Sequence, residues 1–211
     1  MKHSFKLAIV GGNGKVGRFI AKRALEDGYQ VRMLVRDPTR LTNTDERIEI
    51  VKGDAQDINS IRSFLKGCHI VINTLGQPLK DFPIYSVVTK FILTAMNELE
   101  IRRYIGVTGG SLDINGDNKN IINKIGARIF RFLFPKMMAD KKMELEILAS
   151  SDVDWTLVRL PFVVEGSSAG NIKESLTDMP GIKITNIDIA DFIINQISDN
   201  KYIKKTPFIA N

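Results

Sequence analysis

A glycine-rich segment near the start of the chain has the spacing of a phosphate-binding loop. Glycines at positions 11, 14 and 17 follow an apolar run at 5–10 that favours a strand, and they open a run at 16–27 with helical spacing of apolar residues. In this context the first glycine permits a tight turn, the second lets the backbone approach a pyrophosphate, and the third lets the helix pack closely on the strand. The helix N-terminus adds amide donors and a partial positive charge. We therefore predict a dinucleotide site whose loop contacts are Gly11, Asn13, Gly14, Lys15 and Val16.

The loop does not fit the Walker type of nucleotide-binding loop. That motif needs Ser or Thr after Gly-Lys, and Val16 follows Gly14 and Lys15 here. A glycine turn with a purely structural role is the remaining alternative.

The end of the second apolar run, 31–35, bears on the choice of dinucleotide. A site selective for NAD usually has a carboxylate at this strand tip, where it binds the ribose 2′-hydroxyl. Here Arg36 stands at the tip and Arg40 follows about one turn later. A guanidinium can form two parallel hydrogen bonds to a 2′-phosphate, so we predict NADP, with NAD as the less favoured cofactor. In the alternative, Arg36 is a solvated surface residue and Asp37 binds the ribose.

Residues after the third and fourth apolar runs complete the predicted nucleotide site. Asp54 follows the run at 48–51 and can accept a hydrogen bond from the adenine amino group, while the backbone of Ala55 can contact the ring. Asp57 is better placed to cap the helix that follows it. The segment after the run at 70–73 passes under the nicotinamide ribose in this architecture, and it comprises Thr74, Leu75 and Gly76.

Apolar runs alternate with helical patterns along the chain. The predicted strands are 5–10, 31–35, 48–51, 70–73, 103–107 and 155–159, and the predicted helices are 16–27, 59–65, 84–99, 140–150 and 187–197. Such alternation predicts an α/β fold with a Rossmann-type, doubly wound parallel sheet of strand order 3-2-1-4-5-6. We expect a seventh strand at the edge of the sheet, near 207–209. No linker divides the chain, so we predict a single domain over 1–211, with a small substrate or lid region contributed by about 111–138 and 162–186.

Together these segments resemble the atypical short-chain dehydrogenase/reductases of the NAD(P)H-binding, nitrogen-metabolite-repressor-like group, which includes biliverdin and flavin reductases. Beyond the glycines, the resemblance covers nearly the whole chain and is carried by residues 34–38, 53–54, 107–109, 154–161 and 187–190. It implies that Thr108 and Gly109 border the nicotinamide and that Pro161 and Phe162 close over it. The family usually has Pro directly after the Arg of its Asp-Trp-Thr-x-Val-Arg stretch, whereas Leu160 intervenes here.

The standard catalytic pair of this superfamily is missing. Orthodox members use Tyr-x-x-x-Lys, in which the tyrosine is the general acid and the lysine lowers its pKa. Lys141 and Lys142 fall in the matching region, but Met137 and Met138 stand four residues before them. Ser111 matches the position of the family's active-site serine, although a surface or loop serine is an equal alternative. Ser111 and Lys141 are therefore the catalytic candidates.

The missing tyrosine argues against interconversion of carbonyls and alcohols by the standard route. It does not argue against hydride transfer to a planar acceptor that needs little acid catalysis, such as a flavin, a quinone or a tetrapyrrole, with the proton taken from solvent. A non-catalytic NADP-binding redox sensor that acts through a protein partner is the alternative. A sugar-nucleotide epimerase ranks last, because the chain lacks both the tyrosine and a C-terminal substrate domain.

The apolar stretch 121–138 allows three interpretations. Its apolar residues can be ordinary core beneath the sheet, a lid over a flat substrate, or a surface for a partner, with Lys124, Arg128 and Arg131 facing water. Core packing is the favoured interpretation. The lid alternative depends on the turn-rich segment 112–118, which would let the lid move.

The amino-acid composition excludes or disfavours several other classes of protein. One cysteine and two histidines exclude an intrachain disulfide and offer no metal constellation, so no metal is expected. The net charge of +6 is spread along the chain, which gives no indication of nucleic acid. No apolar run approaches the ~20 residues of a membrane span or the core of a signal peptide. We therefore expect a cytoplasmic monomer or homodimer whose partner is a small-molecule acceptor, with no membrane involvement.

Overall fold

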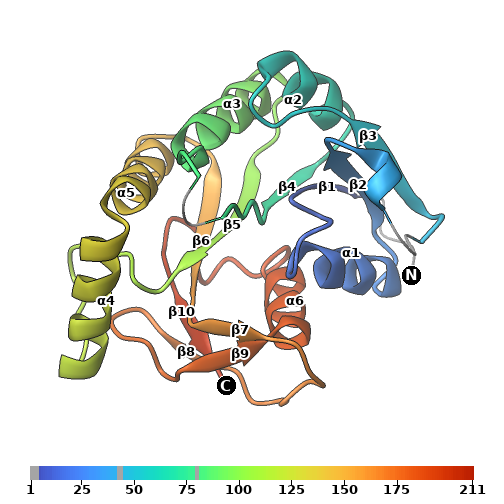
Figure 1. Cartoon of the computed structure of the whole chain (residues 1–211). Helices are drawn as coiled ribbons and strands as arrows, with labels where there is room; N and C mark the ends of the chain where they lie inside the picture. The colour runs from blue at the N-terminus through green and yellow to red at the C-terminus, as the bar shows by residue number, and fades with distance from the viewer. Residues whose placement is uncertain (1–4, 42–44, 79–80) are drawn as a thin grey trace.

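The computed structural model describes residues 5–41, 45–78 and 81–211. Its centre is an eight-stranded sheet (Figure 1). In spatial order the strands are β3 (Ile48–Lys52), β2 (Gln30–Val35), β1 (Lys6–Val10), β4 (Ile70–Asn73), β5 (Arg103–Gly109), β6 (Asp154–Leu160), β10 (Phe208–Ala210) and β8 (Lys173–Ser175). Neighbouring strands pair in parallel except β10 with β8. The predicted Rossmann-type order 3-2-1-4-5-6 is confirmed.

The prediction of a seventh strand at the sheet edge is wrong in one respect. The strand near 207–209 exists as β10, but β8 pairs antiparallel with its outer side and forms the edge. Ala210 lies opposite Lys173 and Phe208 opposite Ser175 in this pair. The physical reason is that a fully buried, apolar β10 leaves unpaired backbone groups on its outer side, which β8 satisfies.

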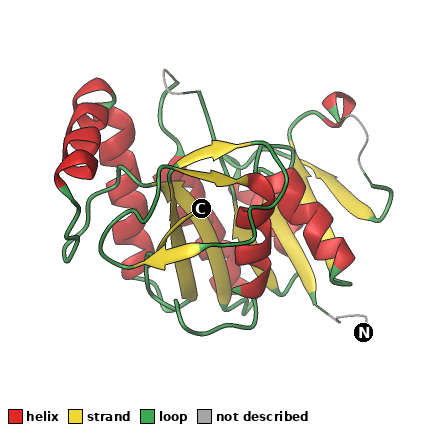
Figure 2. Cartoon of the chain, turned by 90° about the horizontal axis from the view of Figure 1, so that it is seen from below, coloured by secondary structure: helices red, strands yellow, loops and turns green. Residues whose placement is uncertain are grey.

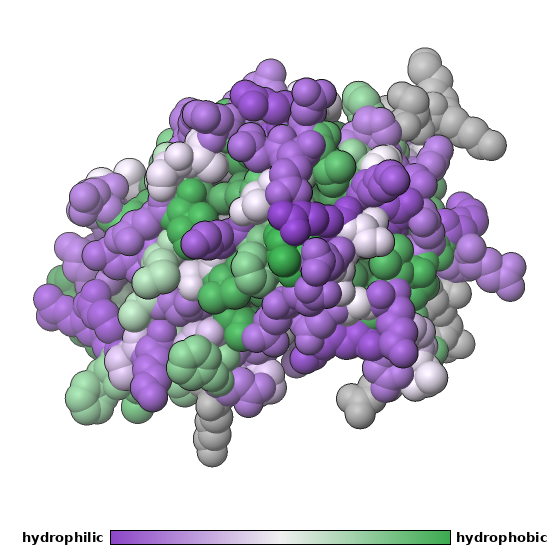
Figure 3. Space-filling model, turned by 90° about the horizontal axis from the view of Figure 1, so that it is seen from above, coloured by the Kyte–Doolittle hydropathy of each residue, from purple (hydrophilic) through white to green (hydrophobic). Residues whose placement is uncertain are grey.

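Helices cover both faces of the sheet (Figures 1 and 2). One face carries α1 (Gly17–Glu26) and α6 (Asn186–Asn195), and the other carries α2 (Ile58–Leu65), α3 (Tyr85–Glu98) and α5 (Pro135–Ala149). Each layer has its own apolar core, in which the aliphatic side chains of the sheet pack on those of the helices. The outer surface of the α2, α3 and α5 layer is mostly hydrophilic, with hydrophobic side chains exposed in between (Figure 3). A short 3-10 turn, η1 (Pro38–Arg40), follows β2, and β7 (Phe162–Val164) pairs with β9 (Lys183–Thr185) in a small second sheet.

The stretch 121–138 forms parts of two helices that meet at a proline. The first helix, α4 (Ile121–Leu133), stops before Pro135, which is the first residue of α5. Proline is favoured at this position because its missing N–H needs no partner there. The second helix therefore begins five residues earlier than the predicted 140–150.

The favoured interpretation of this stretch as core is wrong for α4. Ala127 is the buried residue of this helix, and its large apolar side chains are exposed. The helix lies at the periphery of the molecule, below α5 in Figure 1. Arg131 lies on the side where the helix meets the rest of the chain, in an ion pair with Asp113.

The turn-rich segment 112–118 does not have the features of a hinge. Asp117 accepts two hydrogen bonds from the fully buried Arg159. Lys119, also buried, donates to the carbonyl oxygens of Gly110 and Leu112 and to Asp113. These contacts tie the segment to β6 and to the end of β5, which argues against the mobile hinge that the lid interpretation needs.

The two segments predicted to form a substrate or lid region contact each other. The backbone N–H of Asn118 donates to the carbonyl oxygen of Thr177, at 2.9 Å. Asn120 and Asn123 both donate to the carboxylate of Asp178. Residues from 111–138 and 162–186 therefore form one connected body beside β5 and β6, and its role in substrate binding stays a prediction.

Candidate functional site

The predicted nucleotide contacts lie together at the carboxyl edge of the sheet. Arg36 follows β2, Asp54 follows β3 and Thr74 follows β4, while Thr108 is near the end of β5 and Pro161 follows β6. In open parallel sheets this edge is where ligands bind, at the point where the strand order reverses. The strand order therefore brings together residues that are far apart in the sequence.

Close packing explains the glycines of the loop between β1 and α1. Gly11 has φ +74°, and a Cβ there would lie 2.7 Å from the carbonyl oxygen of Thr74. A Cβ on Gly17 would lie 2.3 Å from the carbonyl oxygen of Gly11. Thr74 ties the two strand ends together, because its hydroxyl donates to the carbonyl oxygen of Val10, at 3.0 Å. The loop is thus pressed against β4 and leaves no room for side chains at these two positions.

The loop also leaves the N-terminus of α1 open to a ligand. Val16 occupies the N-cap position without a side-chain cap, and the first turn of α1 has no acidic residue. Asn13, Gly14 and Lys15 are exposed in front of it. Asn186, at the start of α6, donates to the carbonyl oxygen of Lys15, at 2.9 Å, and holds the loop from the other side. An uncapped helix N-terminus behind an exposed glycine loop suits a pyrophosphate.

At the end of β2 the side chains of Asp37 and Arg36 have different surroundings. Asp37 caps η1 and accepts hydrogen bonds from the backbone N–H and the hydroxyl of Thr39, at 3.2 and 2.6 Å. Arg36 is exposed, and its guanidinium makes no hydrogen bond or ion pair among the residues that the structure describes. The side chain of Arg40 lies outside the described part of the chain.

The acidic residues after β3 accept hydrogen bonds from nearby backbone N–H groups, and the adenine contact of Asp54 and Ala55 stays a prediction. Asp54 accepts a hydrogen bond from the backbone N–H of Gln56, at 2.9 Å, and Ala55 is buried. Asp57 caps α2, as predicted, by accepting from the N–H groups of Asn59 and Ser60. The hydrogen bonds from Ser60 and Asn59 lower the pKa of the Asp57 carboxyl.

Lys141 is buried against the end of β5. Its Nζ donates to the hydroxyl of Thr108, at 3.1 Å, and lies 3.9 Å from the centre of the Tyr85 ring. Burial lowers the pKa of the Lys141 ammonium, and the carboxylates of Glu144 and Asp140 counteract only part of that shift. The structure therefore places the predicted lysine next to a residue implied to border the nicotinamide.

A buried polar chain connects the lysine helix to the loop after β4. Glu144, on α5, accepts a hydrogen bond from the hydroxyl of Thr89, at 3.1 Å. The Thr89 hydroxyl also lies 3.5 Å from that of Tyr104, which accepts from Asn73 at 2.9 Å. The other side-chain atom of Asn73, its Oδ1, accepts from the backbone N–H of Leu75, at 3.1 Å. Burial raises the pKa of Glu144, so the carboxyl favours its neutral form more than an exposed one does.

The two catalytic candidates have separate partners. Ser111 donates to the sulfur of Met138, at 3.6 Å, while Lys141 donates to Thr108. Met137, at the position where the family's tyrosine would stand, is buried. The structure therefore does not join Ser111 and Lys141 into one hydrogen-bonded pair.

The residues that sequence reasoning missed are Tyr85, Thr89, Tyr104 and Glu144. The one local signal was Lys141 and Glu144 three residues apart on a helix, a spacing that puts both on one face. The contact of Tyr85 with Lys141 had no such signal, because it depends on how α3 packs on α5.

Arg159, in the most diagnostic motif of the resemblance, has a structural environment. It donates to the carbonyl oxygens of Thr206 and Leu176 and to Asp117, and its guanidinium carbon lies 3.4 Å from the centre of the Phe208 ring. Beyond it, Phe162 is 81% exposed at the start of β7. An exposed aromatic ring after β6 is free to contact a ligand, as the resemblance implies for Pro161 and Phe162.

Two classes of site find no support in the described residues. No group of three or more histidine, cysteine, aspartate or glutamate side chains there is arranged to hold a metal ion. Nor does any helix of the described ranges combine the length and the apolar character needed to cross a bilayer.

Comparison with known proteins identifies the kind of domain. A family model described as NAD(P)H-binding matches residues 11–200. Vestitone reductase from Medicago sativa is 26% identical over 192 residues, a match covering 75% of this chain. The chain spans less than two thirds of the length of the curated relatives it matches, and 58% of vestitone reductase.

Solved structures share the fold over almost the whole chain. A short-chain dehydrogenase/reductase from Veillonella parvula in complex with NADP has a TM-score of 0.79 and 14% identity, covering 98% of this chain and 94% of that one. ChuY, an anaerobillin reductase from Escherichia coli O157:H7, has a TM-score of 0.80 and 16% identity, covering 97% of this chain and 96% of that one. At these identities the likeness concerns the fold.

Proposed function

Because this chain belongs to the NAD(P)H-binding family, we propose that it is an NADPH-dependent reductase of a small planar acceptor such as a flavin or a quinone. The bound dinucleotide would supply the hydride. The residues of the chain bind and orient the cofactor and shape the space above its nicotinamide. We further propose that the protein is cytoplasmic, that its partner is a small-molecule acceptor and that it does not bind nucleic acid.

The cofactor part of the proposal is supported by the end of β2. Arg36 offers an exposed guanidinium where a ribose 2′-substituent would lie, and Asp37 already accepts two hydrogen bonds from Thr39. A carboxylate occupied in this way is a poorer acceptor for a ribose hydroxyl, while a guanidinium suits a phosphate. The fit of the site to a dinucleotide rests on the cradle at Gly11 and Gly17, which a Cβ would fill.

The reaction part of the proposal rests on one observation, which is that the site lacks the usual acid arrangement. Met137 occupies the position of the tyrosine, and the Ser111 hydroxyl donates to the sulfur of Met138. Lys141 contacts Thr108 and the Tyr85 ring. A planar acceptor that takes its proton from solvent fits this arrangement better than a carbonyl that needs a positioned acid. The similarity of vestitone reductase and of ChuY, both described as reductases, supports the reaction class.

Lys141 has a role in this proposal that needs no proton transfer. Its Nζ bonds to Thr108 and so fixes the hydroxyl at the end of β5, on the side where the nicotinamide ring would lie. Because burial lowers the pKa of this lysine, a nearby negative charge on the cofactor would help to keep it protonated.

A second candidate function is a non-catalytic NADP-binding sensor that acts through a protein partner. The observation that favours it is that Ser111 and Lys141 both have intramolecular partners and do not form a pair. Such a protein would bind the oxidised and reduced cofactor with different affinities and would turn over no acceptor.

One experiment separates the two functions. NADPH oxidation is followed with a panel of flavins, quinones and aldehydes, and the affinities for NADPH and NADP are measured by calorimetry on the same preparation. Turnover with a flavin or quinone and none with aldehydes supports the reductase. Tight NADPH binding without turnover of any acceptor overturns it in favour of the sensor.

A further inference from the structure

Helix α4 presents an apolar face to solvent. Six large side chains on it are between 51% and 84% exposed, namely Ile121, Ile122, Ile125, Ile129, Phe132 and Leu133. At 3.6 residues per turn these six positions share one arc of roughly 120° around the helix. A helix at the surface of a globular protein normally turns such an arc toward the core. Here the arc faces away from the rest of the chain.

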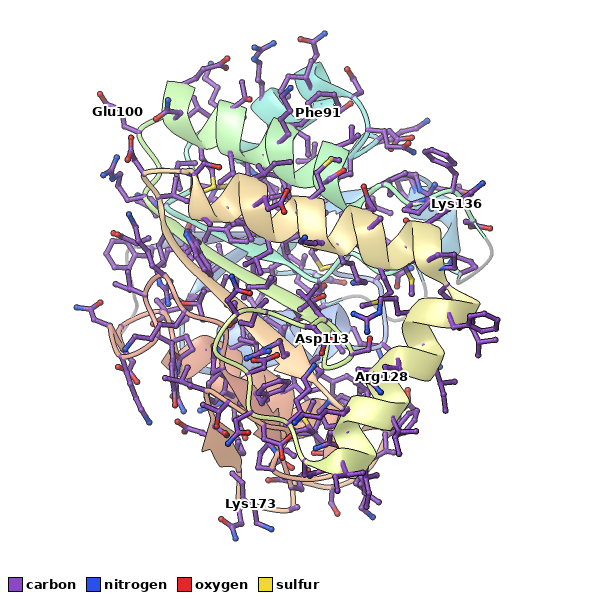
Figure 4. The ribbon with its side chains drawn as sticks, turned by 90° about the vertical axis from the view of Figure 1, so that its left-hand side faces the viewer. Phe91, Glu100, Asp113, Arg128, Lys136 and Lys173 are labelled. Carbon is purple, nitrogen blue, oxygen red and sulfur yellow. The ribbon has the colours of Figure 1, made fainter. Side chains whose placement is uncertain are left out.

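Contacts on the opposite side hold the helix in this orientation. Asn123 donates to Asp178, at 2.7 Å, and Ala127 is buried. Arg131 forms an ion pair with Asp113, at 3.0 Å. Arg128 also lies on the side of α4 that faces Asp113 (Figure 4), but among the described residues it forms no ion pair and is not one of these contacts. Turning the apolar face inward would break these contacts, so the exposed face is built into the fold.

The charged residues of α4 itself and of its flanking residues are all cationic. Residues 118–139 contain no aspartate or glutamate and five lysines and arginines. Within the described ranges, the side chains of Lys124, Arg128 and Lys136 make no ion pair or hydrogen bond. Lys124 and Arg128 also line a pocket of about 260 Å³ between α4 and the segment 113–119, together with Asp113 and Asp117. Cations without partners next to an apolar arc are complementary to a surface that is both apolar and anionic.

This charge pattern argues against a second copy of the chain as the occupant of the face. Two copies of the chain packed through α4 would bring their unpaired cations together with no acidic residue from 118–139 to offset them. We propose that α4 is a docking helix that lies in the interface of a bilayer with anionic headgroups, its apolar face among the acyl chains and its cations against the phosphates. The expectation of no membrane involvement rested on the lack of a spanning segment, which does not bear on a helix lying in the interface.

Such docking is reversible, because a single amphipathic helix buries little apolar area. Each lysine or arginine near an anionic surface contributes about a fivefold increase in the partition coefficient. The contribution falls as salt screens the surface charge. Binding is therefore expected to need both the cations and the apolar side chains.

The test is cosedimentation of the full-length chain with vesicles of phosphatidylglycerol and phosphatidylcholine, with phosphatidylcholine alone as the neutral surface. We expect binding to the anionic vesicles that weakens as salt is raised. The double variant Lys124→Gln/Arg128→Gln should lower the partition coefficient roughly 30-fold, since it removes two cations. Its matched control, Lys66→Gln/Lys90→Gln, removes two exposed lysines elsewhere on the chain and should change it by less than about twofold.

The apolar face is tested separately. The double variant Ile122→Ser/Phe132→Ser should lower binding to anionic vesicles by more than about tenfold. Its control, Phe5→Ser/Val87→Ser, replaces an exposed residue just before β1 and another on α3, and it should not lower binding. Phe132→Trp should give a tryptophan whose emission shifts to the blue with anionic vesicles and is quenched by brominated lipid, and Val87→Trp should not. Circular dichroism and thermal unfolding confirm that each variant is folded. None of these measurements needs cofactor or turnover.

Three results would overturn the proposal. One is failure of the wild type to bind anionic vesicles at low salt. Another is binding that the serine variants leave unchanged, which would indicate adsorption by charge alone. The third is a dimer in sedimentation analysis that Ile122→Ser/Phe132→Ser dissolves, without vesicle binding, which would assign the face to a second copy of the chain.

Discussion

Nη1 of Arg159 donates to both carboxylate oxygens of Asp117, at 2.7 and 2.8 Å. The guanidinium is fully buried in β6 and the carboxylate belongs to the turn-rich segment after β5. This ion pair connects the motif that is most diagnostic of the family to the segment that leads into α4. It gives the arginine at that strand position a structural role.

Arg159→Met should destabilise the protein strongly. Removing one partner of a buried ion pair leaves the other charge uncompensated, at a cost of about 3–5 kcal/mol. The free energy of unfolding from urea titration measures this loss. The control is Arg62→Met, because Arg62 binds Glu98 at the surface, where ion pairs contribute little. A loss at Arg159 no larger than that at Arg62 would contradict the structural role.

Gly17→Ala should weaken both folding and cofactor binding. The new Cβ would lie 2.3 Å from the carbonyl oxygen of Gly11, so the phosphate loop must shift. Overpacking of this kind costs about 1–3 kcal/mol, which is about one to two orders of magnitude in the NADPH dissociation constant if it falls on binding. Calorimetric titration with NADPH, together with urea unfolding, measures both parts.

Gly126→Ala is the matched control for the loop substitution. A Cβ at Gly126 meets open space on α4, and alanine is the better helix former by roughly 0.5–1 kcal/mol. We expect this variant to be slightly more stable and to bind NADPH as the wild type does. Loss of NADPH binding in Gly126→Ala would show that α4 communicates with the nucleotide site.

Arg36→Ala should weaken NADPH binding by about 1–3 kcal/mol, the range of a hydrogen bond to a charged group, and leave NADH binding nearly unchanged. Arg36 is exposed at the carboxyl end of β2, where a 2′-phosphate is expected. Arg102→Ala, which removes an exposed arginine before β5 at the opposite edge of the sheet, is the control. Equal losses for NADPH and NADH would exclude the 2′-phosphate assignment.

The strand order and the glycine loop could be predicted because their signals are local. An apolar run, a glycine triplet and a helical period all lie within about thirty residues, and the handedness of parallel crossovers limits the arrangements that remain. The edge strand β8 had no such signal, because it has three residues and two of them are charged. It becomes a strand only because β10 leaves an edge to pair with.

The candidate site could be predicted in part for the same reason. Lys141 was found because it falls in the region that matches the family's Tyr-x-x-x-Lys. Its neighbour Tyr85 was not found, because their contact depends on the packing of α3 against α5. For α4 the amphipathic pattern was visible, yet a pattern defines a face and not the direction in which it points. Polar contacts such as Asn123 with Asp178 decide that direction, and they join segments that no local pattern relates.

Tyr85→Phe tests whether a protein acid takes part in the reaction. If solvent supplies the proton, kcat with a flavin or quinone should change by less than about threefold, because no positioned acid is lost. Tyr85 is the tyrosine in contact with Lys141, and burial raises the pKa of its hydroxyl. Ser111→Ala is the parallel variant at the other candidate. A loss of kcat of about 100-fold or more in Tyr85→Phe would identify Tyr85 as the general acid. Carbonyl compounds would then again be candidate substrates.

The N-terminus of α6 provides a pH-dependent contribution to stability. Asp188 is buried and accepts hydrogen bonds from the hydroxyls of Ser168 and Thr185, at 2.5 and 2.6 Å, and from the backbone N–H of Ala169, at 3.0 Å. Burial raises the pKa of Asp188, but these donors outweigh it and the net shift is downward. Because the folded pKa lies below the ordinary aspartate value of 3.8, the stabilisation is complete above that value and is lost as the pH falls through the folded pKa.

Asp188→Asn should therefore destabilise the protein most at neutral pH, by about 2 kcal/mol, the scale of a hydrogen bond to a charged group. The difference in free energy of unfolding between wild type and variant should shrink as the pH is lowered below about 4, because the wild-type carboxyl is then protonated. Urea titrations from neutral to acid pH measure it. Asp191→Asn, on the same helix, removes a surface carboxylate that binds Arg23 and controls for the loss of one negative charge. A difference between wild type and Asp188→Asn that stays constant across this range would show that Asp188 acts through its shape and not through its charge.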